Sequence, residues 1–116
     1  MKILLVDDET AMRGTIANIL RSKGFDVVEA SGGDEAFSLF KEQEDINLVV
    51  SDIRMPEGDG MELLKNIKSL KDTPVIIMTG YSQYQTEDLL DLGAETVLNK
   101  PFNPMNFFEL IKEYDK

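Results

Sequence analysis

Short apolar runs of strand length alternate along the chain with longer amphipathic stretches. The runs are rich in β-branched residues, which favour strands. They span residues 3–6, 27–28 with their flanks, 48–50, 75–78 and 97–98. The first, third and fourth runs are apolar throughout, which is typical of strands that are covered on both faces in a parallel sheet.

The stretches between the runs repeat apolar residues at the spacing of an α-helix. These residues are Met12, Ile16, Ile19 and Leu20, then Phe37, Leu39 and Phe40, then Met61, Leu63, Leu64 and Ile67, and finally Phe107, Leu110, Ile111 and Tyr114. A further helix is predicted over residues 83–92. Gly24 and Gly93 are predicted helix ends, and Asn103 followed by Pro104 is a predicted helix start.

Five strands, each followed by a helix, predict one fold class. Strands that are joined by helices must run parallel, and their crossovers are right-handed. The 116 residues suffice for one domain, over residues 1–116. The prediction is an α/β three-layer sandwich with a five-stranded parallel sheet flanked by five helices. The pattern alone leaves the strand order open.

The composition of the chain excludes several kinds of ligand and reactive group. The 12 basic and 22 acidic residues give a net charge of −10, which argues against direct binding of nucleic acid. The absence of cysteine excludes disulfides, thiol nucleophiles and thiolate metal sites, and the absence of histidine means that any imidazole must come from another protein. No apolar run approaches the roughly 20 residues of a membrane span. We expect a cytoplasmic protein without membrane contact.

Polar residues follow four of the predicted strands. They are Asp7 and Asp8, Ser51 and Asp52, Thr79 and Gly80, and Asn99 and Lys100. Because the carboxyl ends of parallel strands share one edge of the sheet, we expect these residues to converge. Three carboxylates that lie close together require a compensating cation.

Mg²⁺ is the natural cation for this site, because it prefers oxygen ligands and is satisfied by a few carboxylates. Such a site leaves room for phosphate oxygens. Lys100 would add a fixed positive charge, Thr79 a hydroxyl donor and Gly80 a backbone N–H. The set therefore suits phosphoryl transfer, with one carboxylate as the nucleophile.

Four segments together resemble the response regulator receiver domains of two-component systems, the CheY-like superfamily. They are VDDE after the first strand, SDIRMPEGDG after the third, MTGY after the fourth and NKPF after the fifth. The resemblance covers the whole chain. It implies a flavodoxin-like sheet of strand order 2-1-3-4-5.

The resemblance also implies roles for individual residues. Asp52 would accept a phosphoryl group from a phosphohistidine on a partner. Mg²⁺ would be held by Asp7, Asp8, Asp52 and the backbone carbonyl of Arg54. Thr79 would contact the phosphate and Lys100 would pair with it, and the Lys100–Pro101 bond would be cis. The protein would be a signalling phosphoacceptor that catalyses only its own phosphoryl transfer and dephosphorylation.

One position departs from the family pattern. Three residues before Lys100 the family usually has Tyr or Phe, and here the residue is Val97. We therefore expect the phosphorylated state to be reported differently, through Tyr81, Tyr84 or the loop between them. We also expect Arg54 and Tyr81, which are large, to obstruct the hydrolytic water. Pro56 and Gly60 are read as ordinary turn residues.

The resemblance implies two interaction surfaces. The first helix, with an exposed Arg13, would contact a sensor histidine kinase or a histidine phosphotransfer protein. The fourth helix, fifth strand and fifth helix would contact a downstream target or output domain, or form a homodimer. Phe107 and Phe108 are adjacent, so we expect one of them to face outward there, unless Phe108 packs at the edge of the apolar stripe. Whether the receiver stands alone or belongs to a longer regulator is left open.

Two other functions remain as alternatives. A haloacid-dehalogenase-type phosphatase would use Asp7 as its nucleophile, but it would have Glu9 where its motif requires a second aspartate. A phosphorylation-independent adaptor of the same fold is the other alternative. Such adaptors usually lack an acidic or lysine position of the site, and none is lost here, so only the Val97 departure keeps this alternative open. The sequence has no G-x-x-x-x-G-K-[ST] motif, which excludes an ATP-binding P-loop.

Overall fold

The computed structural model describes residues 1–53, 55, 59–80, 86–100 and 102–115. Strands and helices alternate along these residues, as predicted. In chain order they are β1 (Lys2–Val6), α1 (Thr10–Ser22), β2 (Asp26–Ala30), α2 (Gly33–Glu42), β3 (Leu48–Asp52), α3 (Gly60–Leu70), β4 (Val75–Thr79), α4 (Thr86–Asp91), β5 (Thr96–Asn99) and α5 (Pro104–Lys112).

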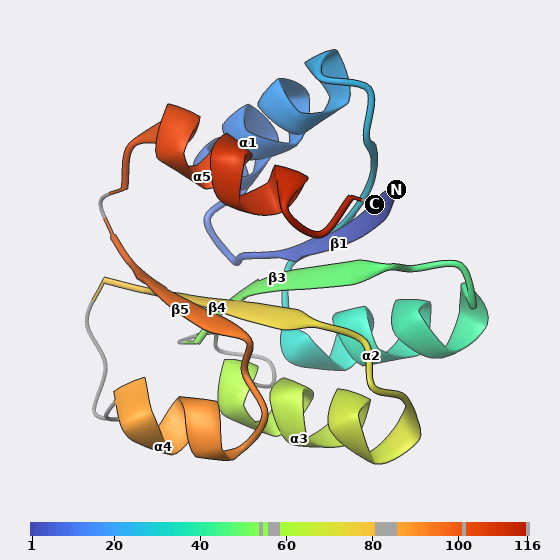
Figure 1. The fold of residues 1–116 in the computed structure, drawn as a ribbon. Helices are drawn as coiled ribbons and strands as arrows, with labels where there is room; N and C mark the ends of the chain where they lie inside the picture. Colours follow the sequence, from blue (N-terminus) through green and yellow to red (C-terminus); the bar gives the residue numbers. More distant parts are fainter. Residues whose placement is uncertain (54, 56–58, 81–85, 101, 116) are drawn as a thin grey trace.

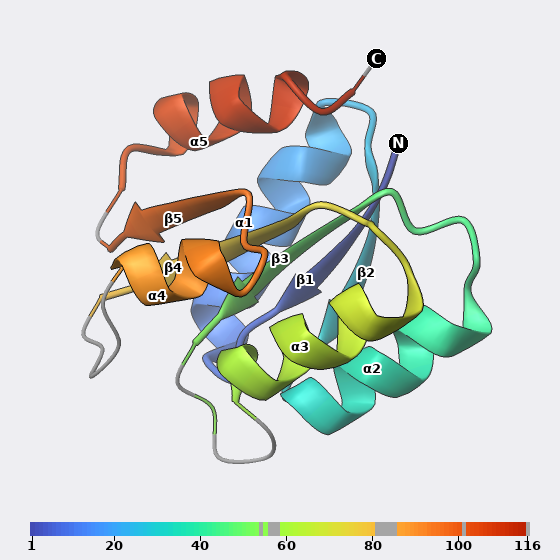
Figure 2. The same cartoon turned by 60° about the horizontal axis from the view of Figure 1, so that its bottom comes forward.

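The five strands form one parallel sheet of order β2-β1-β3-β4-β5. Helices α1 and α5 cover one face of the sheet, and α2, α3 and α4 cover the other (Figure 1). This arrangement confirms the predicted three-layer α/β sandwich and the strand order that the resemblance implied. Figure 2 shows the same layers from a second direction.

The alternation of side chains along each strand divides the core into two clusters. On β1, Ile3 and Leu5 pack with Ile16 and Leu20 of α1 and with residues of α5, whereas Leu4 and Val6 face the other three helices. Strands β3 and β4 are buried throughout, and β1 is buried from its second residue on, while the edge strands β2 and β5 are mostly half-buried. The continuous apolar runs were therefore read correctly as central strands.

Three of the predicted helix boundaries are confirmed. Gly24 and Gly93 follow α1 and α4 with φ angles of +94° and +111°, a conformation that favours glycine. The side chain of Asn103 accepts a hydrogen bond from the backbone N–H of Met105 and caps α5. Residues 83–85, where the fourth helix was predicted to begin, lie outside the described residues.

Two side chains that were considered for exposed positions are not free on the surface. Arg13 is not free on the surface of α1, because its side chain is only 15% exposed and forms an ion pair with Glu29. Phe108 is half-buried and packs against the core cluster on the α1 and α5 side of the sheet, as the alternative interpretation expected. Its ring lies 6.1 Å from the ring of Phe25, and Phe107 is buried in the core. None of the helices in the described ranges is both long and apolar enough to cross a membrane.

Candidate functional site

The carboxyl ends of the strands bring three aspartates together, as the sequence predicted. Asp7 follows β1, Asp8 follows Asp7, and Asp52 is the last residue of β3. One carboxylate oxygen from each of them lies within 4.8 Å of the others. Asp7 and Asp52 are buried, and Asp8 is exposed. We call this cluster of three aspartates the acidic pocket, and Asp8 is its solvent-exposed member.

Lys100 closes this pocket from the end of β5. Its ammonium Nζ donates to Asp52 Oδ2 at 3.0 Å and to Asp7 Oδ2 at 3.2 Å. Burial of the ammonium opposes its charge, but the hydrogen bonds and the attraction of Asp52 and Asp7 outweigh this effect. The pKa of Lys100 is consequently raised above its ordinary value. Lys100 is thus a fixed positive charge between two strand ends.

Asp7 is held at both its backbone and its side chain. Its N–H donates to the carbonyl of Ala30 at 3.1 Å, and its Oδ1 accepts from the N–H of Glu9 at 2.9 Å. Since Oδ2 contacts Lys100, both carboxylate oxygens are oriented. The turn that leads from β1 into α1 therefore presents Asp7 in one defined position.

Asp52 is oriented by its neighbours along the chain. Its Oδ1 accepts from the N–H of Ile53 at 2.8 Å, which leaves Oδ2 on the side of Lys100. The hydroxyl of Ser51 donates to the backbone carbonyl of Asp52 at 2.8 Å and is fully buried. Ser51 therefore supports the strand end and does not present its hydroxyl to the acidic pocket.

Thr79 and Gly80 follow β4 beside Lys100. The backbone N–H of Lys100 donates to the carbonyl of Thr79 at 2.8 Å. Thr79 Oγ1 is buried and has no hydrogen-bond partner among the described residues, so a phosphoryl oxygen would supply an acceptor that it lacks. A Cβ on Gly80 would lie 3.2 Å from the Cβ of Lys100. Glycine here leaves room for the stem of the lysine.

Gly60 has a role that its interpretation as a turn residue missed. It is the first residue of α3, and its N–H donates to the carbonyl of Ile53 at 2.8 Å. A Cβ on Gly60 would collide with the backbone oxygen of Asp52 and would lie 2.8 Å from the Cα of Ile53. The start of α3 thus packs directly against the backbone of Asp52, and only glycine fits.

The sequence matches the response regulator receiver domain family over residues 3–112. The chain belongs to this family. Its acidic pocket and its lysine stand where the resemblance expected them, at the carboxyl ends of β1, β3 and β5. The receiver domain is therefore homologous to regulators of two-component systems.

Curated relatives of this receiver domain differ in length. A chemotaxis protein CheY homologue of Campylobacter jejuni is 37% identical over 120 residues, which cover 97% of this chain and 91% of that protein. The aerobic respiration control protein ArcA of Escherichia coli K12 is 36% identical over 103 residues, covering 88% of this chain and 43% of ArcA. The receiver domain thus spans less than half of the length of ArcA.

A solved structure bears on the acidic pocket. The response regulator protein TrrA from Thermotoga maritima, solved in complex with Mg(2+)-BeF, superimposes with a TM-score of 0.87. It is 33% identical and covers 97% of each chain. The pocket of the receiver domain described here fits Mg²⁺, because it offers three carboxylate oxygens within 4.8 Å of one another. The buried hydroxyl of Thr79, which has no partner among the described residues, suits an anion beside the cation.

The remaining residues of interest divide into two groups. Arg54, Pro56, Tyr81, Tyr84 and Pro101 lie outside the described residues, so their predicted roles and the cis bond stay predictions. Val97 is half-buried and packs against the core cluster between the sheet and α2, α3 and α4. The position that departs from the family pattern therefore faces the side of the sheet that carries α4.

A mainly apolar cavity of about 360 Å³ lies beside the acidic pocket of the receiver domain. It is lined by Ala11, Met12, Thr15, Ile16, Ile19, Lys100, Phe102 and Phe107. We call it the α1–α5 groove. Because Lys100 contributes both to this groove and to the acidic pocket, a partner in the groove would lie next to the aspartates. Sequence periodicity did not reveal the groove, because it forms between two helices far apart in the chain.

Proposed function

We propose that Asp52 is the phosphoacceptor of this receiver domain and that it takes its phosphoryl group from a phosphohistidine of a partner protein. The observation that carries the proposal is the double contact of Lys100 with Asp7 and Asp52 inside a group of three aspartates. A fixed ammonium at this place would stabilise the negative charge that phosphoryl transfer gathers there.

The proposed transfer exchanges one bond for another. A carboxylate oxygen of Asp52 attacks phosphorus, a P–O bond forms, and the P–N bond to the imidazole breaks with its electron pair left on nitrogen. The product is an acyl phosphate on Asp52. Lys100 would pair with a phosphoryl oxygen, and Thr79 Oγ1 and the backbone N–H of Gly80 would donate to others. The protein would act on itself as a signalling phosphoacceptor.

Mg²⁺ belongs to this proposal as the cofactor. Asp7, Asp8 and Asp52 would hold it together with the backbone carbonyl of Arg54, and it would supply positive charge to the transferring phosphoryl group. The three carboxylate oxygens within 4.8 Å of one another support this assignment. Thr79, whose buried hydroxyl lacks a partner among the described residues, supports the phosphate position next to it.

The partners follow from the surfaces around the pocket. Lys100 contacts Asp52 and also lines the α1–α5 groove, so this groove is the proposed contact for a sensor histidine kinase or a histidine phosphotransfer protein. The downstream target or output domain, or a second copy, would bind at α4, β5 and α5. Location in the cytoplasm is part of the same proposal.

The signalling step is proposed to differ from that of relatives with an aromatic residue before the lysine. Val97 is too small to swing between two environments as Tyr or Phe does, so the phosphorylated state would be reported through Tyr81, Tyr84 or the loop between them. Arg54 and Tyr81 are proposed to lengthen that state by obstructing water. Nuclear magnetic resonance of the tyrosines with and without a phosphate mimic tests this, and unchanged tyrosine signals would contradict it.

Intact mass spectrometry tests the phosphoacceptor directly. Wild type, Asp52→Ala and Asp7→Ala are incubated with Mg²⁺ and a small-molecule phosphodonor. We expect wild type to gain one phosphoryl group and Asp52→Ala to gain none. If Asp52→Ala gained the group and Asp7→Ala did not, Asp7 would be the acceptor and the phosphatase alternative would replace this proposal. If no protein gained mass, a phosphorylation-independent adaptor would replace it.

A further inference from the structure

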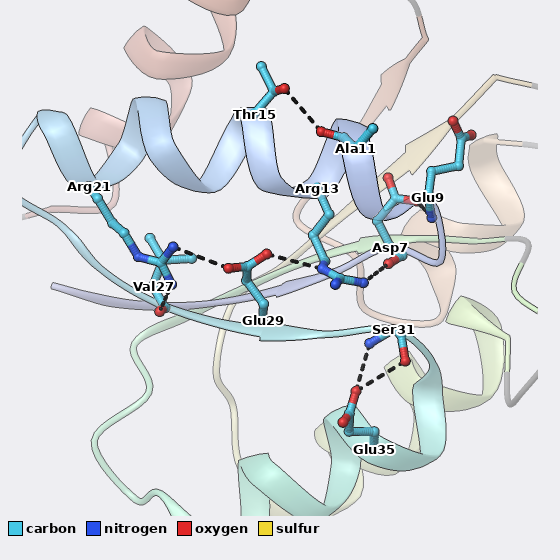
Figure 3. Close-up of polar contacts among 10 residues, drawn as sticks. All are labelled: Asp7, Glu9, Ala11, Arg13, Thr15, Arg21, Val27, Glu29, Ser31 and Glu35. Atoms are coloured by element: carbon cyan, nitrogen blue, oxygen red, sulfur yellow. Dashed lines mark hydrogen bonds and ion pairs between the residues drawn. The ribbon is translucent and has the colours of Figure 1, made fainter.

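Arg13 reaches from α1 to the turn that carries Asp7 and Asp8. Its Nη1 donates to the backbone carbonyl of Asp7 at 2.8 Å, and its Nε donates to Glu29 Oε1 at 3.1 Å (Figure 3). The carbonyl of Asp7 belongs to the peptide bond between Asp7 and Asp8. Arg13 therefore holds the peptide plane from which two of the three carboxylates of the acidic pocket extend.

Arg21 makes the same kind of contacts at the other end of the helix. Its Nη1 donates to Glu29 Oε2 at 3.1 Å, and its Nη2 donates to the carbonyl of Val27 at 2.9 Å. Figure 3 shows Glu29 between the two arginines. Both arginines thus tie α1 to Glu29 of β2, and each also donates to one backbone carbonyl, that of Asp7 for Arg13 and that of Val27 for Arg21. They differ in that only Arg13 touches the Asp7–Asp8 turn.

We propose that Arg13 is a positioning residue for divalent-cation binding at the acidic pocket, and that Glu29 holds it in place. This inference rests on the proposed function of the pocket. Arg13 acts through the Asp7 carbonyl and so fixes the direction in which the Asp7 and Asp8 carboxylates leave the backbone. Residues that orient metal ligands in this way commonly change metal affinity tenfold or more when removed.

The fork of the guanidinium is what suits Arg13 to this role. Nε and Nη1 serve Glu29 and the Asp7 carbonyl at once, which a single ammonium on a flexible stem cannot do with the same fixed geometry. Glu29 has a second effect. By pairing with Nε, it keeps the guanidinium on the backbone side of the turn, where it does not compete with a cation for the carboxylates.

Electrostatics and positioning predict opposite results for the loss of Arg13. Removing a positive charge close to three carboxylates would by itself strengthen the binding of a divalent cation. Loss of the hold on the Asp7–Asp8 turn would weaken it. The direction of the change in Mg²⁺ affinity therefore distinguishes the two effects.

Calorimetric titration with Mg²⁺ alone provides the test. Arg13→Met is compared with wild type, and Arg21→Met is the matched control, because it loses the same kinds of contact away from the turn. We expect the Mg²⁺ Kd of Arg13→Met to rise about tenfold and that of Arg21→Met to stay within about twofold of wild type. Saturating Mg²⁺ should restore the phosphorylation rate of Arg13→Met.

Two further variants keep the test decisive if Arg13→Met folds poorly. Arg13→Lys keeps the charge but not the fork, and Glu29→Gln weakens the hold on Arg13, so both should raise the Mg²⁺ Kd while they melt as cooperatively as wild type. An unchanged or lower Mg²⁺ Kd in the Arg13 variants, or an equal rise in Arg21→Met, would overturn the role of Arg13 but not the proposed function of the acidic pocket. A wild-type protein that does not bind Mg²⁺ would overturn the proposed function as well.

Discussion

Gly14 and Gly60 both lie in helices, but they serve different purposes. A Cβ on Gly60 would collide with the backbone of Asp52 and Ile53, whereas a Cβ on Gly14 of α1 would meet no atom within 4 Å. Glycine inside a helix costs about 1 kcal/mol relative to alanine. Gly14 therefore incurs this cost without a packing reason, while Gly60 allows α3 to start directly against the strand end that carries Asp52.

Alanine substitutions at these glycines should change stability in opposite directions. Gly14→Ala should raise the free energy of unfolding by about 0.5–1 kcal/mol and leave the phosphorylation rate unchanged. Gly60→Ala should lower the free energy of unfolding by about 2–3 kcal/mol, because the backbone of Asp52 must move. The same movement should slow phosphorylation. Urea unfolding and intact mass spectrometry measure both quantities.

The comparison of these variants also carries its own check. Because both substitutions add one methyl group to a helix, a general effect of alanine would move both proteins in the same direction. Equal stabilisation of Gly14→Ala and Gly60→Ala would show that the start of α3 can move away from Asp52 at no cost, against the packing described here.

Sequence reasoning at the residue scale failed where the answer depends on a neighbour from elsewhere in the chain. Gly60 was read as a turn residue because the sequence does not show that α3 begins in contact with the backbone of Asp52. Arg13 was read as exposed because helical periodicity places its Cα but not the end of a long side chain, which folds back onto Glu29. Both errors concern contacts between separate elements.

At the scale of elements, the prediction was more complete. Continuous apolar runs distinguished the central strands, and Asn103, Gly24 and Gly93 gave helix boundaries that the structure confirms. The order of the strands came from the resemblance, since periodicity holds no information on which strands pair. The convergence of Asp7, Asp52 and Lys100 followed from the parallel sheet, because such a sheet aligns the carboxyl ends of its strands.

This shared edge of the sheet predicts how charge affects stability. Lys100 neutralises part of the repulsion among the aspartates through Asp7 and Asp52. In EDTA, Lys100→Met should therefore melt at a lower temperature than wild type. Its free energy of unfolding should be lower by about 1–2 kcal/mol. Asp8→Asn, which removes an exposed carboxylate from the cluster, should melt at a higher temperature. Scanning calorimetry measures these differences.

The gain in melting temperature on adding Mg²⁺ should follow the opposite order to the melting temperatures in EDTA. The cation should raise the melting temperature of Lys100→Met more than that of wild type, because it replaces the missing positive charge, and should stabilise Asp8→Asn least, because a ligand is missing. A similar gain in all three proteins would mean that Mg²⁺ binds elsewhere. A lower melting temperature for Asp8→Asn in EDTA would mean that the carboxylates are not under repulsive strain.

At the scale of the whole molecule, the position of the α1–α5 groove connects the fold to signalling. The groove combines an apolar lining with Lys100, and it borders the acidic pocket of a domain whose net charge is −10. Apolar contact is therefore the expected local source of affinity for a partner, because Lys100 is the one charged residue among the described residues that line the groove. Met12 lines this groove and is 39% exposed, which makes it accessible to a docking helix.

A negative charge at position 12 should weaken docking of the kinase without changing the phosphoryl transfer reaction at Asp52. We expect Met12→Glu to slow phosphoryl transfer from an autophosphorylated histidine kinase that uses the wild type, by about tenfold, since a charged group must be buried in an apolar contact. Transfer from a small-molecule phosphodonor should continue at the wild-type rate, because Asp52 and Lys100 are untouched. Intact mass spectrometry over time measures both rates on the same protein.

Met105→Glu is the matched control for this prediction. Met105 is 58% exposed on α5 and is not among the residues that line the groove. The two substitutions change the net charge equally, so a loss that comes only from charge repulsion of the kinase would appear in both. Slower transfer from the kinase in Met12→Glu alone would assign docking to the groove, because the two variants differ only in where the charge is placed. Equal rates in all three proteins would place the kinase on another face of the receiver domain.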